Sequence, residues 1–118
     1  MIAGLVADIA MATKIAKSAK QCQFAVHNSN RSEPLLECLK TGKVFLVILD
    51  FDHCEAQAYR LLQDCRQIEG IERVSFVGFA SRNQEALKKE AQGAGCHRLY
   101  AKTEFIRELD LLIARSVL

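Results

Sequence analysis

Short runs of apolar residues alternate along the chain with longer segments in which apolar residues recur every three or four positions. The runs predict five strands, in chain order Ile2–Ala7, Gln23–His27, Val44–Leu49, Val74–Phe79 and Arg98–Ala101. The periodic segments predict five helices, near Ile9–Lys20, from Pro34 to Thr41–Gly42, and near Glu55–Gln67, Asn83–Gln92 and Phe105–Val117.

Strands and helices that alternate in this way predict a parallel sheet with right-handed crossovers and helices on both faces. At this length the doubly wound, flavodoxin-like strand order 2-1-3-4-5 is the natural choice. We therefore expect an α/β (βα)5 three-layer sandwich with a five-stranded parallel sheet. No linker, internal repeat or low-complexity segment interrupts residues 1–118, so we expect a single domain.

Three charged residues follow the predicted strands at their carboxyl ends. Asp50 ends the nearly unbroken apolar run Lys43–Phe51, KVFLVILDF, while Asp8 follows the first strand and Lys102 the fifth. Packing does not need a charge at the end of a strand that is covered on both faces. Ligands and chemistry gather at this edge of open parallel sheets. We expect Lys102 to meet the two carboxylates there and to offset a repulsion that would otherwise raise one carboxyl pKa.

The composition and net charge favour a soluble globular domain but do not indicate a specific function. The 118 residues are 50% hydrophobic and 25% charged with a formal net charge of +2, which is ordinary for a soluble domain and argues against nucleic acid or membrane partners. The start, MIAGLVADIAMATK, has no basic leader and does not resemble a signal peptide. Five cysteines without a C-x-x-C pair favour free thiols in the cytoplasm.

The spacing of Asp50, Lys102 and Ala94–Gly95 resembles, over essentially the whole chain, the receiver domain of two-component response regulators. In that family an acidic pair follows strand one, a phosphoacceptor Asp ends strand three, Ser or Thr ends strand four, and Lys ends strand five. The resemblance implies that Asp50 accepts a phosphoryl group and that Lys102 neutralises its charge. It also implies that Asp8 and Asp50 bind Mg²⁺ through their oxygens.

The chain departs from the family pattern around this site. Ala7–Asp8 leaves one carboxylate where the family has two, which predicts weak Mg²⁺ binding. The strand-four switch position falls on Ala80, which has no hydroxyl, and Ser81 comes one residue late as a candidate phosphate contact. We therefore expect weak phosphorylation at Asp50 with little coupling to a conformational switch.

The resemblance also indicates a surface for partners. Leu99 occupies the aromatic position of strand five, and Tyr100 is displaced by one residue onto the other face of the sheet. We expect a divergent or pseudo-receiver, not an enzyme, that acts as a stand-alone monomer or weak homodimer. A histidine kinase or a downstream signalling protein would contact the face from strand four to the last helix, with the residues Tyr100, Phe105, Ile106 and Arg107.

Other readings of the same residues stay open. A fully phosphorylatable, Mg²⁺-dependent phosphotransfer receiver is the main alternative. A redox or metal sensor would use His53 and Cys54 beside Asp50, although adjacent residues rarely converge on one ion. Asp8 and Ser81 could also serve as N-caps of the helices that follow them.

Overall fold

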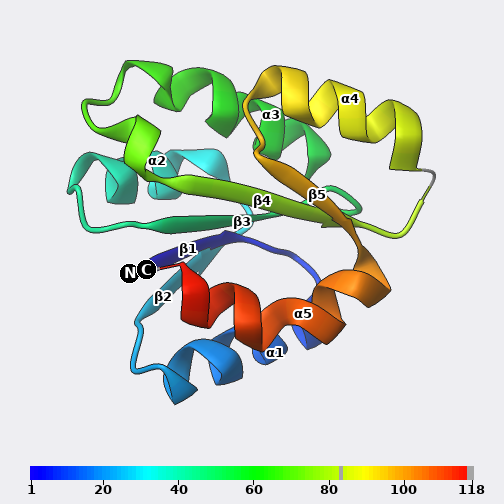
Figure 1. The fold of residues 1–118 in the computed structure, drawn as a ribbon. Coiled ribbons are helices and arrows are strands. Elements are labelled where there is room, and N and C mark those ends of the chain that lie inside the picture. The colour runs from blue at the N-terminus through cyan, green and yellow to red at the C-terminus, as the bar shows by residue number, and fades with distance from the viewer. Residues whose placement is uncertain (83, 117–118) are drawn as a thin grey trace.

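The computed structural model describes residues 1–82 and 84–116 and contains one five-stranded parallel sheet in the order β2-β1-β3-β4-β5 (Figure 1). The strands are β1 Ile2–Leu5, β2 Val26–Ser29, β3 Leu46–Asp50, β4 Ser75–Ala80 and β5 Arg98–Ala101. The helices are α1 Ile9–Gln21, α2 Ser32–Lys40, α3 Glu55–Asp64, α4 Gln84–Ala94 and α5 Lys102–Arg115, with short 3-10 turns η1 Cys65–Gln67 and η2 Ile71–Arg73. The predicted flavodoxin-like fold is confirmed.

Helices cover both faces of the sheet, α1 and α5 on one side and α2, α3 and α4 on the other (Figure 1). The alternation of side chains along β3 supplies both layers, because Val47 and Leu49 pack with the α2–α4 layer, whereas Leu46 and Ile48 pack with α1 and α5. All five residues of β3 are buried. The central strand therefore brings Asp50 to the carboxyl edge of the sheet from inside the core.

A close contact between Phe51 and Gly78 positions the residues that directly follow β3. The ring of Phe51 lies over Gly78 in β4, where an added Cβ would come within 2.5 Å of Phe51 Cε2. The Phe51 amide also donates to the carbonyl of Phe79 at 3.0 Å. Only a residue without a side chain leaves room for this ring, so Gly78 helps to place the loop that follows Asp50.

Several element boundaries differ from the predicted ones. The second strand is Val26–Ser29 because Gln23 and Phe24 belong to the turn that ends α1, donating to Lys20 O and Ala19 O, and Gln23 has φ 62°. The last helix begins at Lys102, earlier than the predicted Phe105. The predicted helix boundaries at Asn83 and Val117 lie outside the described residues. Among the described residues, no helix has the length and apolar character that a membrane crossing requires.

Candidate functional site

Asp50 is a fully buried carboxylate that joins two loops at the carboxyl edge of the sheet. Its side chain is 0% exposed. Oδ1 accepts the amides of Asp52 and His53, each at 3.0 Å. Oδ2 accepts the amides of Ala7 and Asp8 at 3.3 and 3.4 Å. Four backbone donors therefore satisfy a buried charge that would otherwise be costly.

The imidazole of His53 makes a fifth contact with this carboxylate. Its Nδ1 lies 3.2 Å from Asp50 Oδ2 and 3.4 Å from Oδ1, so a hydrogen bond here requires the proton on Nδ1. The His53 side chain is 52% exposed while that of Asp50 is not exposed at all. We conclude that the imidazole forms part of the cover between Asp50 and solvent.

Lys102 pairs with Asp8 and not with Asp50. Its Nζ donates to Asp8 Oδ2 at 2.7 Å, and Asp8 Oδ1 accepts the Met11 amide at 3.1 Å as the N-cap of α1. The hydrogen bond from Lys102, and next that from Met11, lowers the pKa of Asp8, while the bond to Asp8 raises the pKa of Lys102. The predicted N-cap is confirmed, and Lys102 does offset one of the two carboxylates.

The oxygens at this edge do not fit a resident Mg²⁺ ion. The oxygens of Asp50 accept backbone amides, and those of Asp8 bind Lys102 and Met11. Mg²⁺ favours several oxygen ligands in a near-ideal octahedron, and here it would have to displace amides from Asp50 and compete with the positive charge of Lys102 at Asp8. Within residues 1–82 and 84–116, no group of three His, Cys, Asp or Glu side chains is placed to hold a metal.

Cys54 offers little for metal or redox chemistry. Its side chain is buried, and burial, followed by the negative charge of Asp50, raises the pKa of its thiol. The thiolate is the form that binds metals and attacks oxidants, and this environment disfavours it. The contact of His53 with Asp50 is therefore not accompanied by a reactive sulfur.

Asp52 is a functional candidate that the sequence analysis missed. Its carboxylate accepts the Ser81 amide at 2.9 and 3.1 Å and the Ser81 hydroxyl at 2.9 Å. Ala80, at the expected switch position, is buried with the α2–α4 layer, whereas Asp50 is in register with Phe79, which packs toward α1 and α5. The hydroxyl that follows β4 therefore comes from Ser81 and is bonded to Asp52. In the sequence, the only sign of a role for Asp52 was that it is a second Asp two positions after Asp50.

Tyr100 and Phe105 are buried, which corrects their predicted place on a partner surface. They are 4% and 0% exposed, and their rings meet edge to face at 5.8 Å. Phe105 also stacks on Phe79 at 5.0 Å, and the Arg98 guanidinium lies 4.3 Å from the centre of the Tyr100 ring. Tyr100 does face the opposite side of the sheet from Leu99, as predicted. The prediction placed these rings on the surface, whereas in the structure they fill the space between the sheet and α5.

Of the predicted contact residues, Ile106 and Arg107 are exposed, with Ile106 39% exposed. Leu111, one turn further along α5, is 51% exposed. An open groove of about 190 Å³ lies between β5 and α5, with Tyr100 and Leu112 among its lining residues. The outer face of α5 therefore keeps both apolar and charged side chains in contact with solvent.

Comparisons with known proteins identify the class of fold. Neither a protein-family model nor a curated protein matches the sequence. The structure is similar to a response regulator from Hahella chejuensis, with a TM-score of 0.81 and 13% identity over 98% of this chain and 93% of that one. It is also similar to the chemotaxis response regulator CheY4 of Vibrio cholerae, with a TM-score of 0.79 and 10% identity over 98% and 96% of the two chains.

A response regulator protein from Burkholderia multivorans gives a TM-score of 0.72 with 18% identity, over 96% of this chain and 90% of that one. The three matches span nearly the whole of each chain. The fold of this protein is therefore that of response-regulator receiver domains, as the resemblance of the sequence implied. At these identities the fold is shared, and the chemistry has to be argued from the residues of this chain.

Proposed function

We propose that the protein is a receiver-like signalling domain that acts through protein–protein contacts, with weak aspartyl phosphorylation at Asp50 at most. The observation that supports this best is the saturation of the Asp50 carboxylate by four backbone amides and His53. A nucleophile needs a free lone pair directed at the phosphorus atom. Asp50 has to give up existing hydrogen bonds to supply one.

The cation that would stabilise the transition state is also engaged elsewhere. Lys102 binds Asp8 at 2.7 Å, so it neutralises a carboxylate before any phosphoryl group arrives. Mg²⁺ would compete with Lys102 for the same Asp8 oxygen, and we expect its binding to be weak. Both effects reduce the charge stabilisation on which phosphoryl transfer depends. We infer no enzymatic activity beyond this residual self-phosphorylation.

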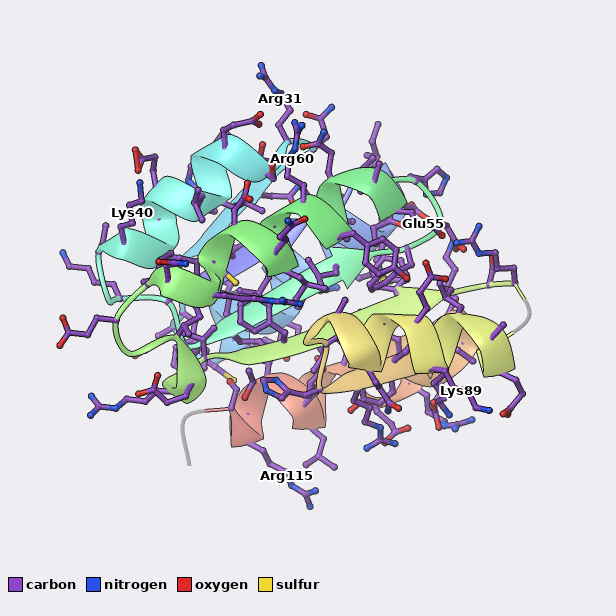
Figure 2. All side chains as sticks on the ribbon, turned by 90° about the horizontal axis from the view of Figure 1, so that it is seen from above. Arg31, Lys40, Glu55, Arg60, Lys89 and Arg115 are labelled. Atoms are coloured by element: carbon purple, nitrogen blue, oxygen red, sulfur yellow. The ribbon has the colours of Figure 1, made fainter. Side chains whose placement is uncertain are left out.

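The partner surface that we propose is the outer face of β5 and α5. Arg107 and Leu111 are exposed there, Ile106 is exposed on the side of α5 next to α1, and Figure 2 shows Arg115 directed outward at the far end of α5. Exposed apolar residues rimmed by charges are typical of protein contact sites. We propose a histidine kinase or a downstream signalling protein as the partner, and a monomer or weak homodimer as the state of the domain.

The surroundings of the thiols support a reducing compartment. All five cysteines are free, which suits the cytoplasm. The net charge of +2 gives no support for nucleic acid as a partner. A redox or metal sensor that uses His53 and Cys54 has less support, because burial holds the Cys54 thiol protonated.

A full phosphotransfer receiver is the second candidate, since Asp50, Asp8 and Lys102 do lie at one edge of the sheet. Incubation with acetyl phosphate and Mg²⁺, followed by intact mass measurement, separates the two. We expect a small phosphorylated fraction that disappears in Asp50→Asn. Stoichiometric phosphorylation of the wild-type protein would favour the second candidate.

The contact surface is tested by capturing partners from native extract and repeating the capture with charge-reversed variants. Arg107→Glu on α5 should reduce recovery of the partner. Lys40→Glu is the matched control, because Lys40 points outward from α2 on the opposite face of the sheet (Figure 2). Equal recovery with both variants would contradict the proposed surface.

A further inference from the structure

The carboxylate of Asp52 connects the two loops that follow β3 and β4. It accepts three hydrogen bonds from Ser81, two from the amide at 2.9 and 3.1 Å and one from the hydroxyl at 2.9 Å. Hydrogen bonds to an ionised acceptor are roughly twice as strong as neutral ones. The amide and the hydroxyl of one serine thus both bind a charge that belongs to the chain itself. We call this set of bonds the Asp52–Ser81 tether.

A second contact reinforces the tether. Arg82 forms an ion pair with Glu55, and its guanidinium donates to the carbonyl of Phe51 at 3.4 Å. Glu55 lies at the start of α3 (Figure 2). Ser81 and Arg82 are consecutive, and both reach the segment 51–55 that begins directly after Asp50. The chain after β4 is therefore attached at two adjacent residues to the chain after β3.

The position of Asp52 is itself fixed by the buried site. Its backbone amide donates to Asp50 Oδ1 at 3.0 Å, while its side chain points the other way, to Ser81. Asp50 therefore holds the backbone of Asp52, and Asp52 holds Ser81. Asparagine at position 50 can keep an oxygen at the Oδ1 position, so this order of contacts does not require a charge on residue 50.

From this geometry we propose that Asp52 is a positioning residue, a built-in anion that keeps Ser81 in one place whatever the charge state of residue 50. The proposal rests on the receiver-like function above, and it gives a physical reason for weak coupling. A phosphoryl group on Asp50 would need a free hydroxyl after β4 to move that segment. Here Asp52 already occupies the hydroxyl, and its negative charge would repel the incoming group.

The consequence concerns the populations of conformers. A modification shifts an equilibrium only when it makes different contacts in the two states. The Asp52–Ser81 tether forms when Asp50 carries no phosphoryl group. The segment after β4 is therefore already hydrogen-bonded to the segment after β3 before any modification. A modification of Asp50 would therefore give this segment no new contact through the Ser81 hydroxyl.

Hydrogen exchange at the Ser81 amide, measured by NMR, tests the tether. Asp52→Ala removes every side-chain acceptor, and we expect exchange at Ser81 to become about threefold to tenfold faster, the range expected for the loss of exposed hydrogen bonds. Asp52→Asn keeps one acceptor oxygen and should give an intermediate rate. Ser81→Ala removes only the hydroxyl and should give a smaller increase at residue 81. Asp64→Ala, at an exposed aspartate at the end of α3, is the matched control and should leave Ser81 unchanged.

The Asp50→Asn variant tests the independence from residue 50. We expect the Ser81 amide to keep its wild-type exchange rate and chemical shift in this variant. Equal exchange in wild type and Asp52→Ala would show that the tether does not form. Loss of Ser81 protection in Asp50→Asn, to the level of Asp52→Ala, would also overturn the proposal. Neither measurement uses a partner or a phosphoryl donor, so the proposed function keeps its own separate test.

Discussion

Removing the Asp50 carboxylate separates two views of this edge of the sheet, because they predict stability changes of opposite sign. A carboxylate that merely repels Asp8 would destabilise the fold, and Asp50→Ala would then raise the free energy of unfolding. The structure instead shows Asp50 as the acceptor for four backbone amides. In Asp50→Ala these partly buried amides lose a charged acceptor that a methyl group cannot replace, and leaving such donors without a partner is costly.

The magnitude follows from the four distances. The two bonds at 3.0 Å are well formed, whereas those at 3.3 and 3.4 Å are long and contribute less. With about 1.5–3 kcal/mol for each good bond to a charged acceptor, partly offset because a charge is no longer buried, the net loss should be about 3 kcal/mol. In Asp50→Asn one oxygen stays, but an NH₂ group faces the amides of Ala7 and Asp8, so the loss should be about 1.5 kcal/mol.

Urea unfolding at neutral pH measures both changes. With an m-value of about 2 kcal/mol/M, the midpoint of Asp50→Ala should fall by about 1.5 M and that of Asp50→Asn by about half as much. Asp64→Asn, at an exposed aspartate, should stay within about 0.5 kcal/mol of wild type. A midpoint of Asp50→Ala at or above the wild-type value would refute the view of Asp50 as a saturated structural acceptor.

Three further changes test neighbouring parts of the structure. Asp8→Ala removes an N-cap and an ion pair and should cost about 1–2 kcal/mol in urea unfolding, whereas Asp8→Asn keeps the cap and should cost about 0.5 kcal/mol; equal losses would argue against the cap. Folding lowers the pKa of Asp8 below its ordinary value of 3.8. The contribution of Asp8 to the free energy of unfolding is therefore complete above pH 3.8 and is lost as the pH falls through the pKa of the folded state. Lys102→Met should weaken this acid dependence, and identical acid titrations of stability would contradict the pairing. Gly78→Ala places a methyl group 2.5 Å from the Phe51 ring and should cost about 2–3 kcal/mol, part of which Phe51→Leu should recover; strictly additive losses would count against the clash.

The order of strands and helices could be predicted from the sequence because each element carries its own local signal. A run such as that of β3 is apolar on both faces, and the helices repeat their apolar residues with helical spacing. The parallel order follows from general rules of chain crossover. Boundaries were less certain where the local signal is weak. The first turn of α5, at Lys102–Glu104, has no apolar residue and joins the helix through backbone hydrogen bonds.

The sequence also indicated that Asp8, Asp50 and Lys102 would meet, because the carboxyl ends of parallel strands share one edge. It did not indicate which residues would pair. Lys102 binds Asp8, His53 contacts Asp50, and no periodicity distinguishes these pairs from the alternatives. Ion pairs and hydrogen bonds form only within a few ångströms, and strand register and loop path set those distances.

Burial of the rings in α5 and β5, and the bond between Asp52 and Ser81, were likewise decided only by tertiary structure. Tyr100 and Phe105 could equally face solvent or the core in a linear reading, and the packing of α5 against the sheet buries both. Asp52 and Ser81 are 29 positions apart and belong to loops without a repeating pattern. Local propensity acts over a few residues, whereas these contacts depend on how β3 and β4 align in the folded sheet.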